Sequence, residues 1–223
     1  MPQAHFHQRL DELTGQLMAM AQMVEELLSS SLAALTERDL ASAQAVILAD
    51  REIDASEIDI EEGCVNLLAL QQPVARDLRR LVAILKINND LERVGDHAVN
   101  IAEAVERLGD ARAEWTIPIE LSESAVIARG MLRDALDAFL QRDSDKAREV
   151  TARDDRVDRL HDALLRSLLT VMMESPARIS SSLDLILISR NVERVADLAT
   201  NIAEDVVYLA EGRTIRHPWI GPR

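Results

Sequence analysis

Paired carboxylates at a repeated spacing are the main source of chemistry in this chain. Glu92 and Asp96 stand four residues apart in "NNDLERVGDHAVNIAE", and Glu193 and Asp197 keep the same spacing in "SRNVERVADLATNIAE". On a helix this spacing brings two side chains within roughly 6 Å, and like charges at that distance destabilise the helix slightly. The pairs therefore have no local stabilising role, and their recurrence indicates that they bind something.

A second set of paired carboxylates precedes each of these segments. Asp50 stands four residues before Asp54, and Asp154 stands four residues before Asp158. If the helices that carry the two sets pack together, each half of the chain gathers four carboxylates. An all-oxygen, negative cluster suits hard cations such as Mg²⁺, Ca²⁺, Mn²⁺ or ferric iron.

Iron, zinc, magnesium and manganese are the candidate ions, and the pattern does not choose among them. The predicted metal ligands are Asp50, Asp54, Glu92 and Asp96 in the first half, and Asp154, Asp158, Glu193 and Asp197 in the second. Two other interpretations remain open, because such carboxylates could also form an ordinary solvated face or contact a basic partner surface.

Hydrophobic residues recur at helical spacing through the segments that must position these carboxylates. From Leu10 onward they return every three or four residues, which predicts a first helix of about 30 residues. A second helix is expected from about Leu40 to Leu70. Proline is tolerated in a first helical turn, so Pro73 marks the start of a third helix, which ends near Leu108.

The chain is an internal repeat of this three-helix unit. After a linker from Gly109 to Pro118 the pattern begins again, and a shift of 101 residues makes 12 of the 25 positions from 84 to 108 identical. With 48% hydrophobic but only 2% aromatic residues, the composition also favours packed helices. We therefore predict an all-α fold of six long helices in two tandem, pseudo-symmetric three-helix bundles, residues 1–110 and 111–223.

The third helix has a clear division between a core side and an outer side. A helical wheel places one apolar stripe toward the core: Ile87, Leu91, Val94, Ala98, Ile101, Val105 and Leu108. The polar residues on the opposite side are Asn89, Glu92, Asp96, Asn100 and Glu103. The repeated carboxylates are therefore expected on an outer face of each bundle.

The composition excludes several classes of function. A net charge of -14 argues against a nucleic-acid ligand, because such binders place basic groups on phosphates. No segment approaches the roughly 18 uninterrupted apolar residues of a membrane span, so we expect a cytoplasmic protein without direct membrane insertion. The single cysteine, Cys64, is expected to be a small buried helical residue.

No catalytic constellation is evident, so the chain is not expected to be an enzyme. A ferritin-like di-iron site needs Glu-x-x-His pairs, but Gly95 follows Glu92 at that spacing and Ala196 follows Glu193. There is also no glycine-rich phosphate loop. His97 has no counterpart in the second copy and is expected on a helix surface, and the repeated Arg93 and Arg194 are expected to form ion pairs.

The whole chain resembles the PhoU family of phosphate-transport regulators. The resemblance rests on the paired "LERVGDHAVNIAE" and "VERVADLATNIAE", on the turn "QQPVARDLR" and on the ending "YLAEGRTIRH", in matching order and spacing. It implies tandem three-helix bundles whose surface carboxylate motifs bind metal clusters. The second copy departs at Arg190 and Asn191, where the first has Asn89 and Asp90, so the two sites need not be equivalent.

The resemblance also implies a function and partners. It indicates a negative regulator of the phosphate-starvation response, an adaptor between the ATPase of a phosphate ABC transporter and a sensor histidine kinase, which commonly forms a homodimer. A metal-storage or redox protein is the alternative that the carboxylate clusters alone would favour.

Overall fold

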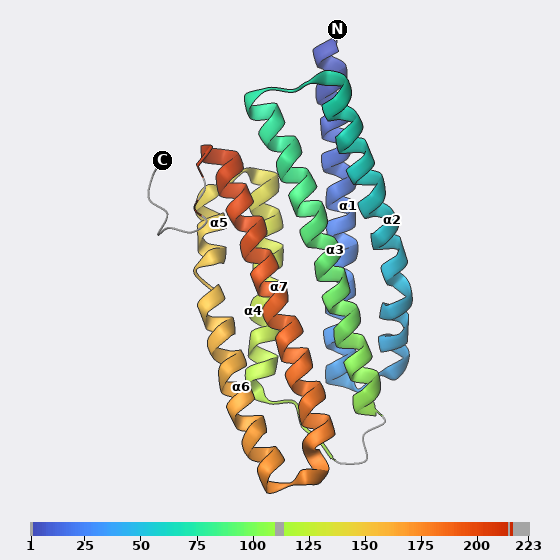
Figure 1. Cartoon of the computed structure of the whole chain (residues 1–223), viewed down its shortest axis with the longest axis vertical. Coiled ribbons are helices and arrows are strands. Elements are labelled where there is room, and N and C mark those ends of the chain that lie inside the picture. Colours follow the sequence, from blue (N-terminus) through green and yellow to red (C-terminus); the bar gives the residue numbers. More distant parts are fainter. Residues whose placement is uncertain (1, 110–113, 214, 216–223) are drawn as a thin grey trace.

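Two helical bundles stand side by side in the computed structural model of this chain (Figure 1). The structure describes residues 2–109, 114–213 and 215, and these contain no strand. The all-α prediction is confirmed. The predicted division between residues 110 and 111 lies outside the described residues.

Three long helices form the first bundle. They are α1 (Pro2–Glu37), α2 (Leu40–Gln71) and α3 (Ala75–Gly109). Pro73 lies in the turn that precedes α3 rather than in its first helical turn.

The second bundle repeats this arrangement with one interruption. Its elements are α4 (Ile119–Gln141), α5 (Ser144–Thr151), α6 (Asp154–Glu174), the short 3₁₀ helix η1 (Pro176–Arg178) and α7 (Ile179–Glu211). The predicted arrangement of six helices is present, with the fifth helix divided into α5 and α6.

The two repeats begin their second helix with the same turn. Arg38 and Arg142 adopt the left-handed conformation, with φ of 57° and 54°, and each is followed by an aspartate that caps the next helix. Asp39 accepts hydrogen bonds from two backbone N–H groups of α2, and Asp143 does the same for α5. These bonds satisfy donors that a helix start would otherwise leave unpaired.

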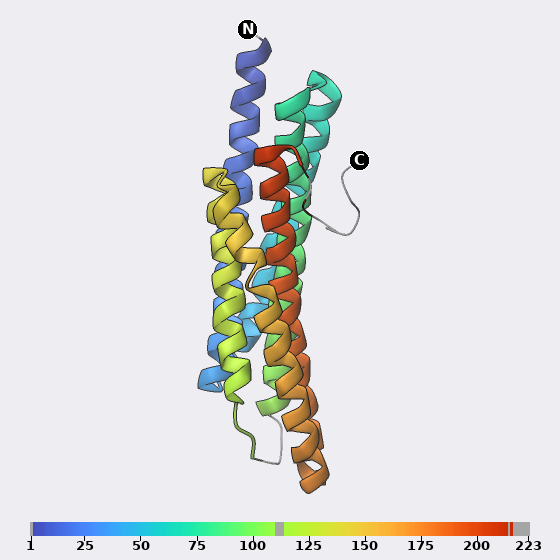
Figure 2. The ribbon, with the colours of Figure 1, turned by 90° about the vertical axis from the view of Figure 1, so that its left-hand side faces the viewer.

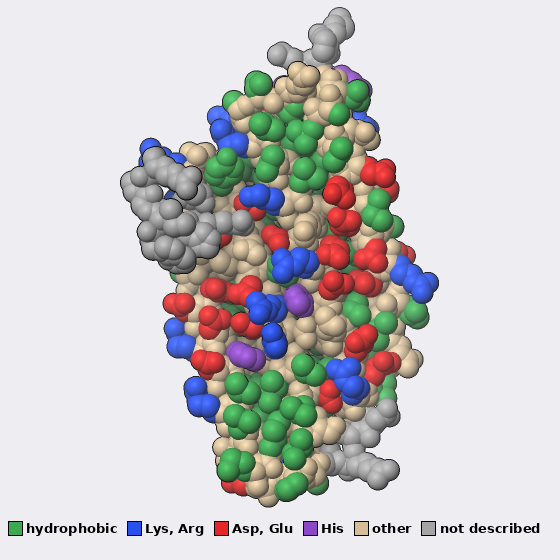
Figure 3. Space-filling view, viewed as in Figure 1, with side chains coloured by type: hydrophobic (Ala, Val, Ile, Leu, Met, Phe, Trp, Pro, Cys, Tyr) green, Lys and Arg blue, Asp and Glu red, His purple; other side chains and the backbone are tan. Residues whose placement is uncertain are grey.

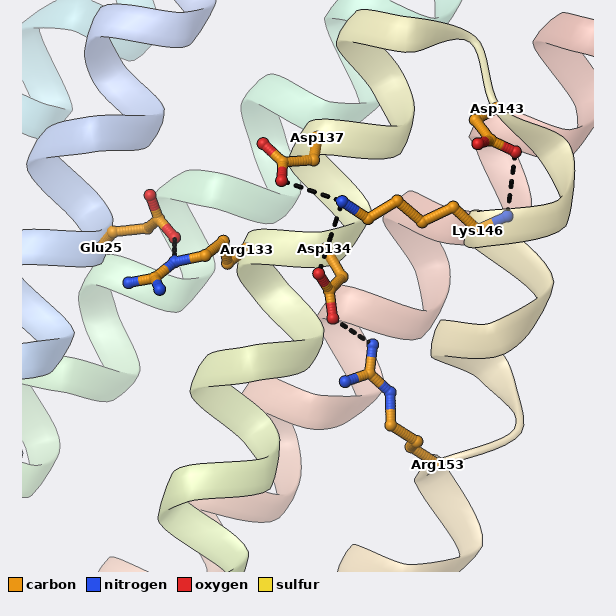
Figure 4. A network of polar contacts seen from close by, with 7 residues as sticks. All are labelled: Glu25, Arg133, Asp134, Asp137, Asp143, Lys146 and Arg153. Atoms are coloured by element: carbon orange, nitrogen blue, oxygen red, sulfur yellow. Dashed lines mark hydrogen bonds and ion pairs between the residues drawn. The ribbon is translucent and has the colours of Figure 1, made fainter.

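A network of ion pairs surrounds the break between α5 and α6 (Figure 4). Arg153, in the break, contacts Asp134 of α4 at 2.6 Å, and Lys146 of α5 contacts Asp137 at 2.9 Å. At the corresponding position α2 continues without interruption through Ala49, which has no charge to direct toward the neighbouring helix. The break thus coincides with a positive charge that only the second repeat has. Because of the break, Asp154 is the first residue of α6.

The core stripe of the third helix is confirmed. All seven of its predicted residues are buried, whereas Asn89, Asp96, Asn100 and Glu103 are exposed and Glu92 is half-buried. Both α3 and α7 bury more than one face, since they pack against their own bundle and against each other. Figures 1 and 2 show them side by side and antiparallel at the centre of the molecule, with the bundles offset along the long axis.

Two ion pairs across the α3–α7 interface have the same polarity. Cationic side chains come from α3 and carboxylates from α7: Lys86 contacts Asp205 at 2.9 Å, and Arg107 contacts Asp184 at 2.7 Å. The side chains of Asp205 and Asp184 are only 4% and 10% exposed. A buried carboxylate is costly without a cation or hydrogen-bond donors, so these pairs set which faces of the two helices meet.

We expect the substitution Arg107→Met to lower the free energy of unfolding by about 1–3 kcal/mol, because it leaves the carboxylate of Asp184 without its cation. Urea unfolding followed by circular dichroism would measure the loss. Arg166→Met is the matched control: this arginine is exposed on α6, and its substitution should change stability by less than about 0.5 kcal/mol.

A double variant gives the sharper test of the same pair. A shift of 101 residues matches Arg107 with Tyr208 and Asp184 with Ala83. Arg107→Tyr combined with Asp184→Ala removes both charges together and should recover at least half of the loss. An equally unstable double variant would show that the buried charge is not what Arg107 compensates.

Candidate functional site

The first carboxylate cluster forms where α2 packs against α3. Asp50 and Asp54 come from α2, and Glu92 and Asp96 come from α3, so the condition on which the sequence analysis grouped them, that these two helices pack together, is met. Asp50 lies close against α3, because a Cβ atom added at Gly95 would be 3.2 Å from its Oδ1. The absence of a side chain at Gly95 therefore makes room for this carboxylate.

The charges of this cluster act on one another. Burial raises the pKa of Asp50 above its ordinary value, and the nearby charges of Asp54 and Asp96 raise it further. Burial likewise raises the pKa of Glu92, with added effects from Asp96 and from Glu57. The four predicted residues therefore share one electrostatic environment.

Glu57 is a member that the spacing analysis missed. Burial raises its pKa, and so do the charges of Glu61 and Asp54. It stands three residues after Asp54 on the same side of α2, so a search that included i,i+3 neighbours would have found it.

The second cluster has Asp154 at its centre. Burial raises the pKa of Asp154 to about 6, and the charges of Asp158 and Asp197 contribute. Its Oδ1 atom is buried without a hydrogen-bond partner among the described residues, and so is Oγ1 of Thr200 on α7. The Thr200 hydroxyl lies close enough to the carboxylate to lower the pKa of Asp154, against the larger effects of burial and of the charges of Asp158 and Asp197.

Asp158 extends this cluster toward the end of α6. Burial raises its pKa, followed by the charges of Asp197, Asp155 and Asp162, while His161 opposes the shift. The pairwise analysis missed Asp155 and Asp162. The latter stands four residues after Asp158, so continuing the same spacing by one step would have included it.

Two predicted ligands of the second cluster differ from their first-repeat counterparts. Glu193 is half-buried, but it is not among the charges that raise the pKa of Asp154 or Asp158. Asp197 accepts a hydrogen bond from Arg194 at 3.0 Å, whereas Arg93 pairs with Asp90 at 3.6 Å. The predicted arginine ion pairs are thus present, and in the second repeat one of them engages a candidate ligand.

The clusters do not form a ready-made coordination site. Among the described residues, no group of three Asp, Glu, His or Cys side chains is arranged to hold a metal ion. The donors suit a hard cation in type and charge, and the unpaired Oδ1 of Asp154 is an acceptor that an ion could use. For a metal ion to bind, several of these carboxylates would have to rotate so that their oxygen atoms coordinate the same ion.

Two histidines, His97 and His161, make polar contacts with side chains of α7. Nδ1 of His97 is 2.8 Å from Oδ1 of Asn191, across the α3–α7 interface. The amide nitrogen of Asn191 donates to the carbonyl of Leu187, so its Oδ1 accepts and His97 donates. The prediction of a surface histidine missed this contact, which depends on the partner helix. His161 makes a similar contact with Ser189, at 2.8 Å.

One face of the molecule carries both clusters. Figure 3 shows two acidic areas, over α2–α3 and over α6–α7, separated by a strip of Lys, Arg and His side chains along the α3–α7 interface. Hydrophobic side chains gather at both ends of the same face. The exposed apolar residues at these ends are Leu70, Val74 and Leu78 near the α2–α3 turn, and Met173, Ile179 and Leu183 near the α6–α7 turn.

Other expectations about the chain can be compared with the structure. Cys64 is buried, as predicted, and burial raises the pKa of its thiol to about 12. Among the helices of the described residues, none is long and apolar enough to cross a bilayer.

Fold and site together define a class of protein: tandem three-helix bundles that present acidic clusters on a shared face. The PhoU domain model matches residues 17–105 and 121–206. These two matches account for most of both bundles, and the chain belongs to the PhoU family.

Relatives and solved structures agree with this assignment. A phosphate-specific transport system accessory protein PhoU homolog from Pseudomonas putida is 40% identical, over 95% of this chain and 83% of its own. A protein of the same description from Clostridium acetobutylicum is 36% identical, over 94% and 96%. The crystal structure of PhoU from Pseudomonas aeruginosa superposes with a TM-score of 0.91 at 38% identity, covering 93% of this chain and 100% of the other. The phosphate transport system regulatory protein PhoU from Streptococcus pneumoniae gives a TM-score of 0.87 at 32% identity, covering 94% and 99%.

We expect Asp154→Asn to stabilise the metal-free protein at neutral pH. The pKa of Asp154 is raised in the folded state, so folding retains a proton that the unfolded chain loses. Its unfavourable contribution therefore develops between about pH 4 and pH 6 and is complete above pH 6. Because the carboxylate of Asp154 is partly exposed, we expect Asp154→Asn to raise the free energy of unfolding by only about 1 kcal/mol at pH 7. This gain should vanish near pH 4.

Urea unfolding in the presence of EDTA, at several pH values from about 4 to 7.5, would measure this difference. Asp145→Asn, at an exposed position on α5, is the control for the loss of one negative charge. A stability difference between Asp154→Asn and wild type that does not change with pH would contradict the assignment.

Proposed function

We propose that this chain is a non-enzymatic cytoplasmic adaptor that regulates phosphate transport and represses the phosphate-starvation response. In this proposal it links the ATPase of a phosphate ABC transporter to a sensor histidine kinase when phosphate is plentiful. The match to PhoU accessory proteins over nearly the whole chain is the observation that carries it.

Exposed apolar side chains at the two ends of the shared face support a role in binding proteins. Met173, in the last turn of α6, is 86% exposed, and Leu70, in the last turn of α2, is 78% exposed. Figure 1 shows these two helix ends at opposite ends of the molecule. Monomeric proteins rarely expose contiguous apolar patches without using them for interaction. Two separate apolar ends suit an adaptor that contacts two proteins, or a homodimer that uses one end and a partner that uses the other.

Metal binding at the two carboxylate clusters is the second part of the proposal. Burial is the main cause of the raised pKa values of Asp50, Glu92, Asp154 and Asp158, and repulsion between neighbouring negative charges adds to it. A bound cation would relieve this repulsion. In an adaptor such an ion would be structural or regulatory. The carboxylates alone would equally suit a metal-storage or redox protein, but the family resemblance favours the adaptor.

Affinity capture with the full-length chain is the experiment that tests the adaptor role. From phosphate-replete cells we expect recovery of a sensor histidine kinase and a phosphate-transporter ATPase, identified by mass spectrometry. Leu70→Lys combined with Met173→Lys should reduce recovery by about ten-fold or more, because a charge in each apolar end opposes desolvation. Recovery of neither protein from replete or starved cells would sink the proposal.

Val126→Lys is the matched control for this capture. Val126 is 64% exposed on α4, in a groove that α4 forms with α1, away from the two apolar ends. The control should capture both partners as wild type does. If it loses them equally, the loss reflects a general effect of added lysine rather than of the shared face.

Metal binding is tested by chelation, reloading and elemental analysis. Wild-type protein reloaded with iron, zinc, magnesium or manganese should retain at least one of these ions and unfold at a higher temperature. Asp96→Asn combined with Asp197→Asn should lower the bound-metal stoichiometry, whereas Asp59→Asn with Glu149→Gln, two exposed acids elsewhere, should leave it unchanged. An unchanged stoichiometry in the Asp96/Asp197 variant would show that the sites are misassigned.

A further inference from the structure

A cavity of about 470 Å³ opens between the two repeats, at the end of the molecule opposite the interrepeat linker. It is lined by His7 of α1, by Arg76 and Arg80 at the start of α3, by Arg142 of the α4–α5 turn and by the last turn of α7. Figure 2 shows that α1 and α3 extend beyond the end of the second bundle here. The cavity lies at this step, so anything bound in it contacts both repeats.

The lining is basic, although the protein as a whole carries a charge of -14. Three arginines line the cavity, and Asp77 is the one acidic residue among the described lining residues; it lies 3.5 Å from His7. Arg80 is held in place, because its Nη2 contacts both Asp11 and Thr14 at 2.9 Å and its side chain is only 18% exposed. Within the described part of the chain, Arg76 and Arg142 have no acidic partner.

The internal repeat supplies a direct comparison for Arg142. Arg38 stands at the same place in the first repeat, in the same left-handed conformation before a capping aspartate. Its guanidinium donates to the carbonyl of Trp115 at 2.7 Å and lies 4.3 Å from the centre of the indole ring. The first-repeat arginine is thus satisfied by an aromatic ring and a carbonyl, whereas Arg142 faces an open cavity.

We propose that this cavity binds a small phosphate-bearing anion, with Arg76, Arg80 and Arg142 as its ligands. Guanidinium groups form paired, charge-assisted hydrogen bonds with phosphate oxygens, and several of them converging on a concave site favour a polyvalent oxyanion. The volume lies within the range of small-molecule sites. The cavity is larger than a single phosphate group needs. In the first repeat the same turn places Arg38 against an aromatic ring. A nucleotide, which has both phosphates and a ring, would match the volume and this arginine geometry.

This site is separate from the acidic clusters and does not depend on the adaptor role. It lies at the end of the interface between the repeats, whereas the clusters lie along the sides of the shared face. A ligand that contacts α3, α7 and the α4–α5 turn together would strengthen the association of the two bundles.

Isothermal titration calorimetry of the full-length chain tests the proposal, with ATP, pyrophosphate and orthophosphate as separate probes. EDTA is included, so that a metal ion held by the acidic clusters cannot bridge to the phosphates, and the salt concentration is held at about 0.15 M. Saturable binding of one equivalent is expected, with a matching rise in the unfolding temperature. Tighter binding of ATP than of the inorganic anions would identify a nucleotide, and equal binding of all three would identify the phosphate group alone.

Two substitutions connect binding to the cavity. Arg142→Asn keeps a residue that tolerates the left-handed conformation, and Arg76→Gln keeps a long polar side chain in the helix. Each should weaken binding by about ten-fold or more without lowering the unfolding temperature of the free protein. Arg166→Gln, an exposed arginine on α6, should bind as wild type does.

Two results would overturn the proposal. One is the absence of binding by all three probes to the wild-type protein, which would leave the arginines to a carboxylate of a partner protein. The other is unchanged affinity in the combined Arg76→Gln and Arg142→Asn variant, which would place the bound anion elsewhere on the molecule.

Discussion

The antiparallel packing of α3 against α7 is the constraint on which the rest of the structure depends. These two helices make the most extensive contact between the bundles, and α1 and α4 add a smaller one. Their apolar residues supply most of the driving force, because burial is non-directional and scales with area. The faces of α3 and α7 that meet are selected by two ion pairs. The buried carboxylates of Asp184 and Asp205 lie against Arg107 and Lys86. In the observed register each of these buried carboxylates lies against a cation, which offsets the cost of burying it.

The positions of the candidate sites follow from this packing. With α3 and α7 at the centre, α2 and α6 lie on either side of them, and each acidic cluster forms along one flank of the same face. The offset between the bundles leaves a step at each end. At one end the step is next to the arginine-lined cavity, and at the other Trp115 covers Arg38. The α3–α7 interface thus determines where the two acidic clusters and the arginine-lined cavity lie, although their residues are far apart in the sequence.

The two repeats show how similar sequences acquire different local chemistry. Asp50 lies in a continuous helix and packs against Gly95, whereas Asp154 begins a helix and has an unpaired, buried oxygen atom. The difference coincides with Arg153, which contacts Asp134 on a neighbouring helix and has an uncharged counterpart in the first repeat, Ala49. Because the second repeat has its own set of charges on α4 and α5, its cluster has a different geometry, and equal affinity of the two clusters for any ligand is not expected.

Much of the architecture could be read from the sequence because it depends on periodicity. The spacing of Ile87, Leu91 and their successors predicted the buried side of α3. The repeated carboxylates lie outside this apolar stripe, where Asp96 is exposed and Glu92, Glu193 and Asp197 are half-buried. The buried thiol of Cys64 was predicted from its apolar, helical surroundings. In these cases the local pattern of one helix contains the answer, since an amphipathic helix has one way to bury its apolar face.

What only the tertiary structure decided are the contacts between residues distant in sequence. The break before Asp154, the contact of His97 with Asn191 and the grouping of Arg76, Arg80 and Arg142 each require two or more helices at a particular offset and rotation. The sequence by itself determined which face of each helix turns inward and that the chain is a duplicated three-helix unit. It could not determine which outward charges meet, because a polar side chain has many acceptable neighbours and only the packing of the helices selects among them.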